Sequence, residues 1–125
     1  MMIPILKLHD TLLTSIQVEL TDDDALEFQA DVLNKIRLSE AEGLVIDITA
    51  LEVVDSYLAR ILNDTATMAK LLGTETVICG MQPAVSLTLV EMGRQLIGVE
   101  SALNLDQAME KVEVLIAARA SGGQP

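Results

Sequence analysis

The chain has 125 residues, which suits one compact domain with a single hydrophobic core. Half of the residues are hydrophobic but only 2% are aromatic, so aliphatic side chains must fill the core and stacking of bases or sugars on rings is disfavoured. The formal net charge of −11 repels phosphate backbones and anionic headgroups, so we expect no nucleic-acid partner and no membrane partner.

The amino-terminal residues and the single cysteine bear on location and redox chemistry. The segment Met1–Lys7 shows no charged region followed by a long apolar stretch, and no apolar run approaches the ~20 residues of a membrane span. We therefore expect a cytoplasmic protein. Cys79 cannot form an internal disulfide, and because it lies in an apolar run typical of a strand, we predict a buried, unreactive thiol.

The first third of the chain predicts a hairpin followed by a helix. Pro4–Leu8 and Leu12–Val18 are rich in branched residues and are separated by a turn at His9–Thr11. Thr21 and the three aspartates after it predict the start of a helix, because a hydroxyl cap and early acidic charge both stabilise that end. We expect Gly43 to end this helix.

The middle of the chain predicts two buried strands joined by a helix. The apolar run Gly43–Thr49 has one carboxylate near its end and is typical of a central strand buried on both faces. A helix is expected from about Asp55, closed by Gly73, and Glu75–Cys79 predicts the next strand. The inner stripe of that helix is expected to comprise Leu58, Ile61, Leu62, Thr65, Met68, Ala69 and Leu72.

The last third predicts a helix, a short strand and a final helix. Pro83 suits the first turn of a helix, and Asn104 resembles the cap of another that continues through Ile116. Val99–Leu103 between them predicts a short strand, and the tail 121–125 is expected to be flexible. The inner stripe of the helix after Pro83 is expected to comprise Val85, Leu89, Met92 and Leu96. The alternation of helix and strand favours an α/β domain with helices packed against a sheet.

Two apolar residues lie off the inner stripe of the helix after Pro83. Leu87 and Val90 fit either exposed contacts for assembly or core positions of a thin domain. The sequence leaves both interpretations open.

No catalytic or metal-binding pattern is evident in the sequence. The only histidine, His9, lies in the predicted first turn, and neither a Cys/His cluster nor a glycine-rich phosphate loop is present. Asp47 and Asp55 could pair, but acids at strand ends and helix starts are common structural features. We therefore expect no enzyme activity, no cofactor and no metal.

The junction after the predicted central strand places Asp55 and Ser56 at a helix entrance. Both residue types are preferred N-caps, so one interpretation is that either of them bonds the free N–H groups of the first turn. The other interpretation is an exposed Ser56 that accepts a phosphate, which would add roughly −1.5 to −2 charge. Asp55 and Asp47 would then strengthen an acidic patch. The local sequence by itself slightly favours the cap.

The strand Leu44–Thr49, the Val54-Asp55-Ser56 junction and the order of elements resemble the STAS domain family of anti-sigma-factor antagonists over nearly the whole chain. The resemblance implies the STAS fold over residues 1–120, an α/β domain with a central mixed sheet of about four to five strands and about four helices packed against it. It also implies that a serine kinase phosphorylates Ser56, and it carries Asp47 and Asp55 over as the family's acids. The expected switch and partner-binding surface comprises Asp47, Asp55, Ser56, Tyr57 and Arg60.

The sequence around Ser56 also bears on which subtype of the STAS family the chain resembles. Sporulation-type members read Asp-Ser-Ser-Gly here, whereas this chain lacks the second serine and the glycine. The junction and the opening Ile3–Lys7 resemble the RsbS-type scaffold of the bacterial stressosome. That resemblance implies a non-catalytic scaffold that sequesters an RsbT-type serine kinase until Ser56 is phosphorylated. It further implies RsbR-type co-antagonists, an RsbX-type phosphatase, and a homodimer or larger assembly.

Two other functions remain open at this point. One is a sporulation-type antagonist that binds an anti-sigma kinase. The other is a small-ligand module, for example for nucleotides, which would need a pocket near the junction at Ser56.

Overall fold

The computed structural model describes residues 2–91 and 99–121. In this part of the chain, five strands form one mixed sheet in the order β1-β2-β3-β4-β5, with β1 antiparallel to β2 and all other neighbours parallel. The predicted α/β fold is confirmed. The strands are β1 (Ile5–Leu8), β2 (Thr11–Ser15), β3 (Gly43–Asp47), β4 (Glu75–Cys79) and β5 (Glu100–Ala102), and the helices are α1 (Asp22–Ser39), α2 (Ser56–Leu71), α3 (Pro83–Glu91) and α4 (Leu105–Ala120).

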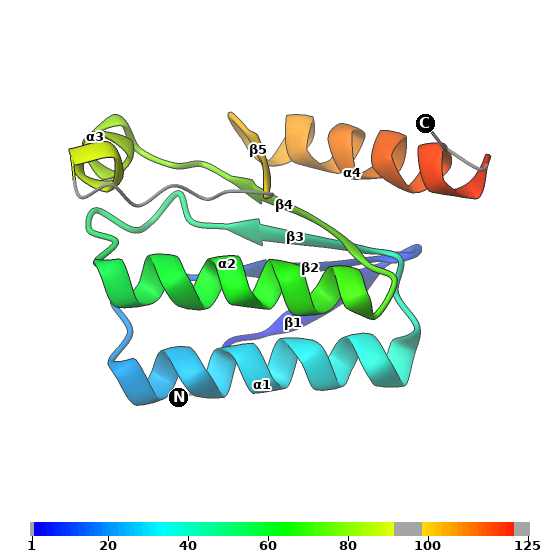
Figure 1. Ribbon diagram of the computed structural model, residues 1–125, viewed down its shortest axis with the longest axis horizontal. Helices are drawn as coiled ribbons and strands as arrows, with labels where there is room; N and C mark the ends of the chain where they lie inside the picture. Colours follow the sequence, from blue (N-terminus) through cyan, green and yellow to red (C-terminus); the bar gives the residue numbers. More distant parts are fainter. Residues whose placement is uncertain (1, 92–98, 122–125) are drawn as a thin grey trace.

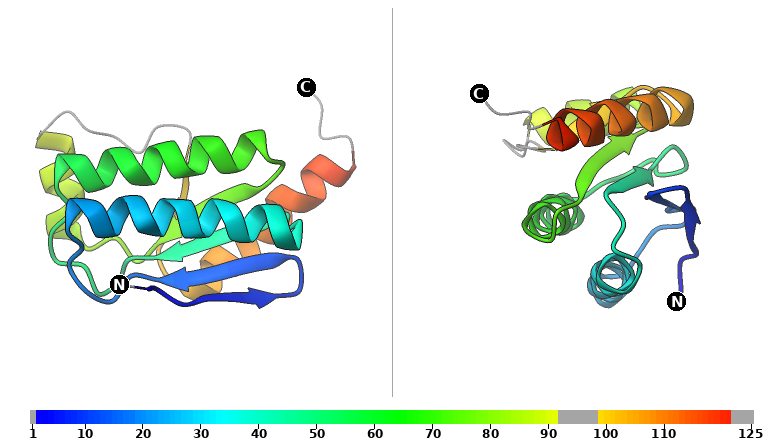
Figure 2. Two further views of the ribbon diagram at one scale, coloured as in Figure 1. Left: turned by 90° about the horizontal axis from the view of Figure 1, so that it is seen from below. Right: turned by 90° about the vertical axis from the view of Figure 1, so that its right-hand side faces the viewer.

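The helices cover the two faces of the sheet unequally (Figures 1 and 2). α1 and α2 lie on one face and α4 lies on the other. The connections from β2 to β3 and from β3 to β4 each move one strand in the same direction across the sheet. Because such crossovers are right-handed, their helices α1 and α2 lie on the same side. α4 follows the last strand and packs across β3, β4 and β5 on the opposite face.

Two apolar clusters fill the two interfaces. The larger lies between the sheet and α1, α2 and α3, and the smaller lies beneath α4. Leu44 and Ile46 belong to the larger cluster and Val45 to the smaller, because successive strand residues point to opposite faces. β3 is therefore buried on both faces, as the apolar run predicted.

The start of α1 follows the prediction. Thr21 is the N-cap, and its hydroxyl accepts a hydrogen bond from the Asp24 amide at 3.1 Å. The Asp24 carboxylate accepts one in return from the Thr21 amide at 3.3 Å. These hydrogen bonds lower the pKa of Asp24. The two reciprocal bonds form a capping box that fixes where the helix begins.

The end of α1 differs from the prediction. The helix ends at Ser39, and Glu40 adopts the left-handed conformation with φ of 54°, so the expectation that Gly43 ends the helix is wrong. Gly43 instead begins β3. A Cβ atom there would lie 2.7 Å from the Thr11 hydroxyl and 2.9 Å from Val112, so glycine is needed for the close approach of β2 and α4.

Smaller departures concern strand ends and one helix face. β2 and β3 end at Ser15 and Asp47 rather than at Val18 and Thr49. Met68 and Leu72 were expected on the inner stripe of α2 but are 40% and 52% exposed. Gly73 does close that helix, with φ of 91°.

The carboxy-terminal elements follow the prediction where the structure describes them. Val85 and Leu89 are buried, as expected of the inner stripe of α3, whereas Met92, Leu96 and the tail 122–125 lie outside the described residues. Leu87 and Val90 are exposed, which favours the first of the two interpretations given for them. Among the described residues, no helix has the length and apolar character needed to cross a membrane.

Candidate functional site

The predicted switch residues lie at one end of the sheet, where β3 ends and α2 begins (Figure 1). β2, β3 and β4 are parallel, so their carboxyl ends meet at this end. The connection from β3 to α2 is held in place by Leu51 and Val54, which are both 1% exposed within the larger cluster. These two buried side chains thus fix the position of the connection that leads to Asp55 and Ser56.

Asp55, rather than Ser56, is the N-cap of α2. Its carboxylate accepts a hydrogen bond from the Leu58 amide at 2.8 Å, and its carbonyl accepts one from the Ala59 amide at 3.0 Å. Ser56 is the first residue of the helix and is exposed. Within the described residues, no hydrogen bond involves the Ser56 hydroxyl. The structure therefore separates the two interpretations of the junction: Asp55 caps the helix, and the Ser56 hydroxyl is available to solvent.

Tyr57 and Arg60 differ in how far they reach the surface. Tyr57 is half-buried and packs against the larger cluster, so its ring anchors the first turn of α2. Arg60 is exposed, with its Nε 3.9 Å from a carboxylate oxygen of Asp64 one turn further on. Arg60 follows Ser56 by four residues, a spacing that puts two side chains on the same side of a helix.

Asp47 holds a turn at the end of β3. Its carboxylate accepts hydrogen bonds from the Thr49 amide at 2.9 Å and from the Thr49 hydroxyl at 2.5 Å. Gln82 donates its side-chain amide to the Thr49 carbonyl at 2.8 Å. Gly80 has φ of 80°, and a Cβ atom on it would lie 1.9 Å from the Thr49 hydroxyl. Asp47 thus holds the turn with which the connection from β3 to α2 begins.

Three of these residues were missed by sequence reasoning. Thr49 meets Asp47 through the local turn after β3, whereas Gly80 and Gln82 join them only because β3 and β4 end side by side. The one usable signal was Gly80, a glycine placed directly after a strand at the edge where the parallel strands end.

Cys79 lies beside Asp47 in the register of β3 and β4 and is fully buried, as predicted. Burial, with a smaller contribution from the negative charge of Asp47, raises the pKa of its thiol to about 11. A thiol that stays protonated near neutral pH is a poor nucleophile.

His9 and the possible metal ligands do not cluster in the part of the chain that the structure describes. His9 lies in the turn between β1 and β2 with φ of 57° and is exposed. The described residues contain no group of three or more His, Cys, Asp or Glu side chains arranged to hold a metal ion.

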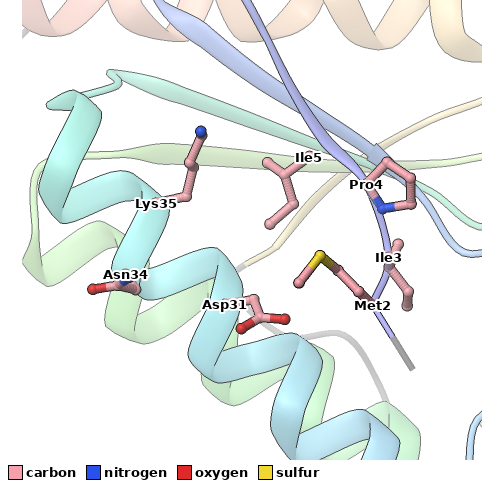
Figure 3. A pocket seen from close by; sticks show the side chains of 7 residues that line it. All are labelled: Met2, Ile3, Pro4, Ile5, Asp31, Asn34 and Lys35. Carbon is pink, nitrogen blue, oxygen red and sulfur yellow. The ribbon is translucent and has the colours of Figure 1, made fainter.

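One pocket lies between the chain entering β1 and the side of α1 (Figure 3). Its volume is about 230 Å³, below the range of roughly 300–1,000 Å³ typical of small-molecule sites. None of the five predicted switch residues lines it, so this pocket does not supply the ligand site near Ser56 that a nucleotide-binding module would need. Its lining comprises Met2, Ile3, Pro4, Ile5, Asp31, Asn34 and Lys35.

A family model described as the STAS domain matches residues 3–108. The chain belongs to the STAS domain family. Among solved structures, this STAS protein is similar to a serine-to-glutamate variant of RsbS from Moorella thermoacetica, with 41% identity, a TM-score of 0.80, and coverage of 92% of this chain and 97% of that one. It is also similar to a chain in a solved structure of the stressosome, which is described as a signal integration and transduction hub. The two chains are 43% identical with a TM-score of 0.77, and the match covers 90% of this chain and 97% of that one.

A curated relative is the RsbT co-antagonist protein RsbRD of Bacillus subtilis (strain 168). The two are 30% identical over 78 residues, which make up 62% of this STAS protein. The matched region spans 28% of the length of RsbRD. The resemblance to the RsbS type is thus supported in both sequence and structure, over nearly the whole chain.

Proposed function

We propose that this protein is a non-catalytic scaffold of the stressosome that holds an RsbT-type serine kinase and releases it when Ser56 is phosphorylated. The observation that carries the proposal is the division of roles at the start of α2, where Asp55 caps the helix and the Ser56 hydroxyl remains exposed. A hydroxyl engaged as a cap would have to break a structural bond before it reacted. In the part of the chain that the structure describes, the Ser56 hydroxyl has no such bond to break.

The charge of a phosphate at Ser56 suits a switch that leaves the fold intact. The partial positive charge at the amino terminus of a helix tolerates an anion there. Arg60 lies one turn away on the same side, and its one ion pair among the described residues is an exposed contact with Asp64 at 3.9 Å, so it is available to a phosphate on Ser56. The phosphorylated domain therefore keeps its structure while its surface becomes more acidic.

The same charge disfavours a partner that has docked on the neutral serine. Asp55 adjoins Ser56, and the exposed Glu52 precedes it by four residues in the chain, so a phosphate adds to an acidic segment. Where the docked partner faces this phosphate with a carboxylate, the like-charge juxtaposition across the interface costs several kcal/mol, which is enough to release a partner bound at micromolar strength. An RsbX-type phosphatase would restore the neutral serine.

Assembly with other STAS domains is part of the proposal. The similarity to a chain of the stressosome structure and to an RsbT co-antagonist favours co-assembly with RsbR-type proteins. The exposed apolar residues Leu87 and Val90 on α3 supply one surface for such contacts.

The experiment compares kinase binding by variants that differ at Ser56. We expect Ser56→Ala to bind an RsbT-type kinase as the wild type does, and Ser56→Asp to bind it at least about tenfold more weakly, because the added charge lies in the interface. Thr67→Asp is the matched control, since it adds the same charge to an exposed position further along α2. Isothermal titration calorimetry gives the dissociation constants.

Two outcomes would contradict the proposal. If Ser56→Asp binds the kinase as tightly as the wild type, charge at Ser56 does not control release. If Thr67→Asp weakens binding as much as Ser56→Asp does, the effect belongs to net charge and has no specific site.

A further inference from the structure

Among the described elements, no helix packs over β1 and β2 on the sheet face that carries α4. α4 packs on β3, β4 and β5, and the hairpin of β1 and β2 extends beyond it (Figure 2). On the uncovered side of this hairpin, Leu6 is 62% exposed and Leu8 is 48% exposed. Leu13, the partner of Leu6 in the register of the two strands, is half-buried against the smaller cluster. A sheet face that bears three leucines is normally covered by another element.

Two grooves lie between this hairpin and α4, each of about 230 Å³. Leu8 lines the first of them and Leu6 and Leu13 line the second, so the hairpin supplies one apolar wall. The wall opposite comes from the near side of α4. Its larger apolar residues are Leu105, Met109 and Ile116, which are all partly buried. We call the two grooves together the hairpin–α4 groove.

The charges that line the hairpin–α4 groove are of one sign. Three carboxylates border it, from Asp10, Asp47 and Glu113, and its described lining includes no lysine or arginine. An apolar floor with an acidic border complements a segment that has an apolar stripe flanked by basic residues. A second copy of this chain, itself at a net charge of −11, would bring further carboxylates toward these three.

We propose that the hairpin–α4 groove docks an amphipathic helix of a partner protein, with its apolar stripe between the hairpin and α4 and its lysine or arginine residues against Asp10 and Glu113. On the opposite face of the sheet, α1 and α2 lie side by side. The docked helix would lie beside α4 in the same way, so that two helices cover each face. The groove shares Asp47 with the expected switch surface, but its lining includes neither Asp55 nor Ser56, and the docking does not require phosphorylation.

The test uses a fluorescein-labelled peptide of leucine and lysine, 16 residues long to match α4, with leucines at helical spacing. Fluorescence anisotropy measures its dissociation constant. Leu6→Asp is expected to weaken binding at least about tenfold through loss of apolar burial. Simple charge attraction predicts the opposite, because the substitution makes the protein more acidic.

Matched variants separate the groove from the rest of the surface. Val114→Asp adds the same charge at a side chain that is 66% exposed on α4 outside the groove, and we expect no weakening. Glu113→Gln is expected to weaken binding about two- to fivefold. Glu110→Gln, on the same helix but outside the groove lining, is expected to leave binding unchanged.

Three results would overturn the proposal. The first is equal binding of the peptide by Leu6→Asp and Val114→Asp, each with a wild-type circular dichroism spectrum. The second is equally strong binding of a peptide in which glutamate replaces every lysine. The third is a wild-type dimer in light scattering that Leu6→Asp converts to a monomer, since a second copy would then cover this face.

Discussion

Substitutions at Asp55 and Ser56 separate the structural role of the α2 entrance from its proposed signalling role. In Asp55→Ala the Leu58 amide loses its acceptor at 2.8 Å, and loss of a helix cap costs about 1 kcal/mol, within a range of roughly 0.5–2. Loss of the negative charge at the helix amino terminus adds roughly 0.3–1 kcal/mol. Ser56→Ala removes a hydroxyl that makes no hydrogen bond among the described residues, so its effect should stay within about 0.5 kcal/mol.

Urea unfolding followed by far-ultraviolet circular dichroism measures these differences. A loss of 1–2 kcal/mol shifts the unfolding midpoint downward by on the order of 0.5–1 M urea, whereas Ser56→Ala should leave the midpoint within about 0.25 M of the wild type. Asp55→Asn is the control, because an asparagine cap keeps an acceptor oxygen while losing the charge. If Ser56→Ala destabilises the protein as much as Asp55→Ala, then Ser56 is a structural cap and the assignment of roles is wrong.

Two further predictions concern the residues behind the switch surface. Gly80→Ala should lower the free energy of unfolding by at least about 1 kcal/mol more than Gly73→Ala does. Both glycines have positive φ, but a Cβ atom on Gly80 also collides with Thr49, whereas a Cβ atom on Gly73 would lie 3.5 Å from its nearest neighbour. Urea midpoints of the two variants check this, and equal losses would rule out the collision. The buried Cys79 thiol has a pKa of about 11 against roughly 8.5 when unfolded, so the unfolded state loses its proton first and stability should fall as pH rises from about 8.5 toward 11. Cys79→Ala should show a smaller fall in the urea midpoint over that pH range, and identical slopes for the two proteins would refute the shift.

The sequence predicted the elements of the fold well where the signal was local. The capping box at Thr21 depends on residues three apart, and the burial of β3 follows from a continuous apolar run. Gly43 was misinterpreted because its reason lies in distant residues: Thr11 on β2 and Val112 on α4 leave no space for a side chain. The preference for glycine after a helix end therefore drew attention to Gly43 and assigned it the wrong role.

The candidate site was predicted in part for the same reason. Asp47 and Ser56 were found from their places at a strand end and a helix start. The choice of cap between Asp55 and Ser56 depends on which side chain turns toward the Leu58 amide, which the sequence does not contain. Met68 and Leu72 fit the helical stripe of α2 but are partly exposed, because a stripe predicts a direction and not how far the sheet beneath it extends.

The most direct test of the proposed switch follows phosphorylation and kinase release in one sample. The protein is incubated with an RsbT-type kinase and ATP, and phosphate is located by mass spectrometry while the bound kinase is measured by size-exclusion chromatography. We expect one phosphate, on Ser56, with loss of the complex in proportion to it, and neither change in Ser56→Ala. A phosphate on another residue, or a complex that persists when Ser56 is fully phosphorylated, would contradict the account.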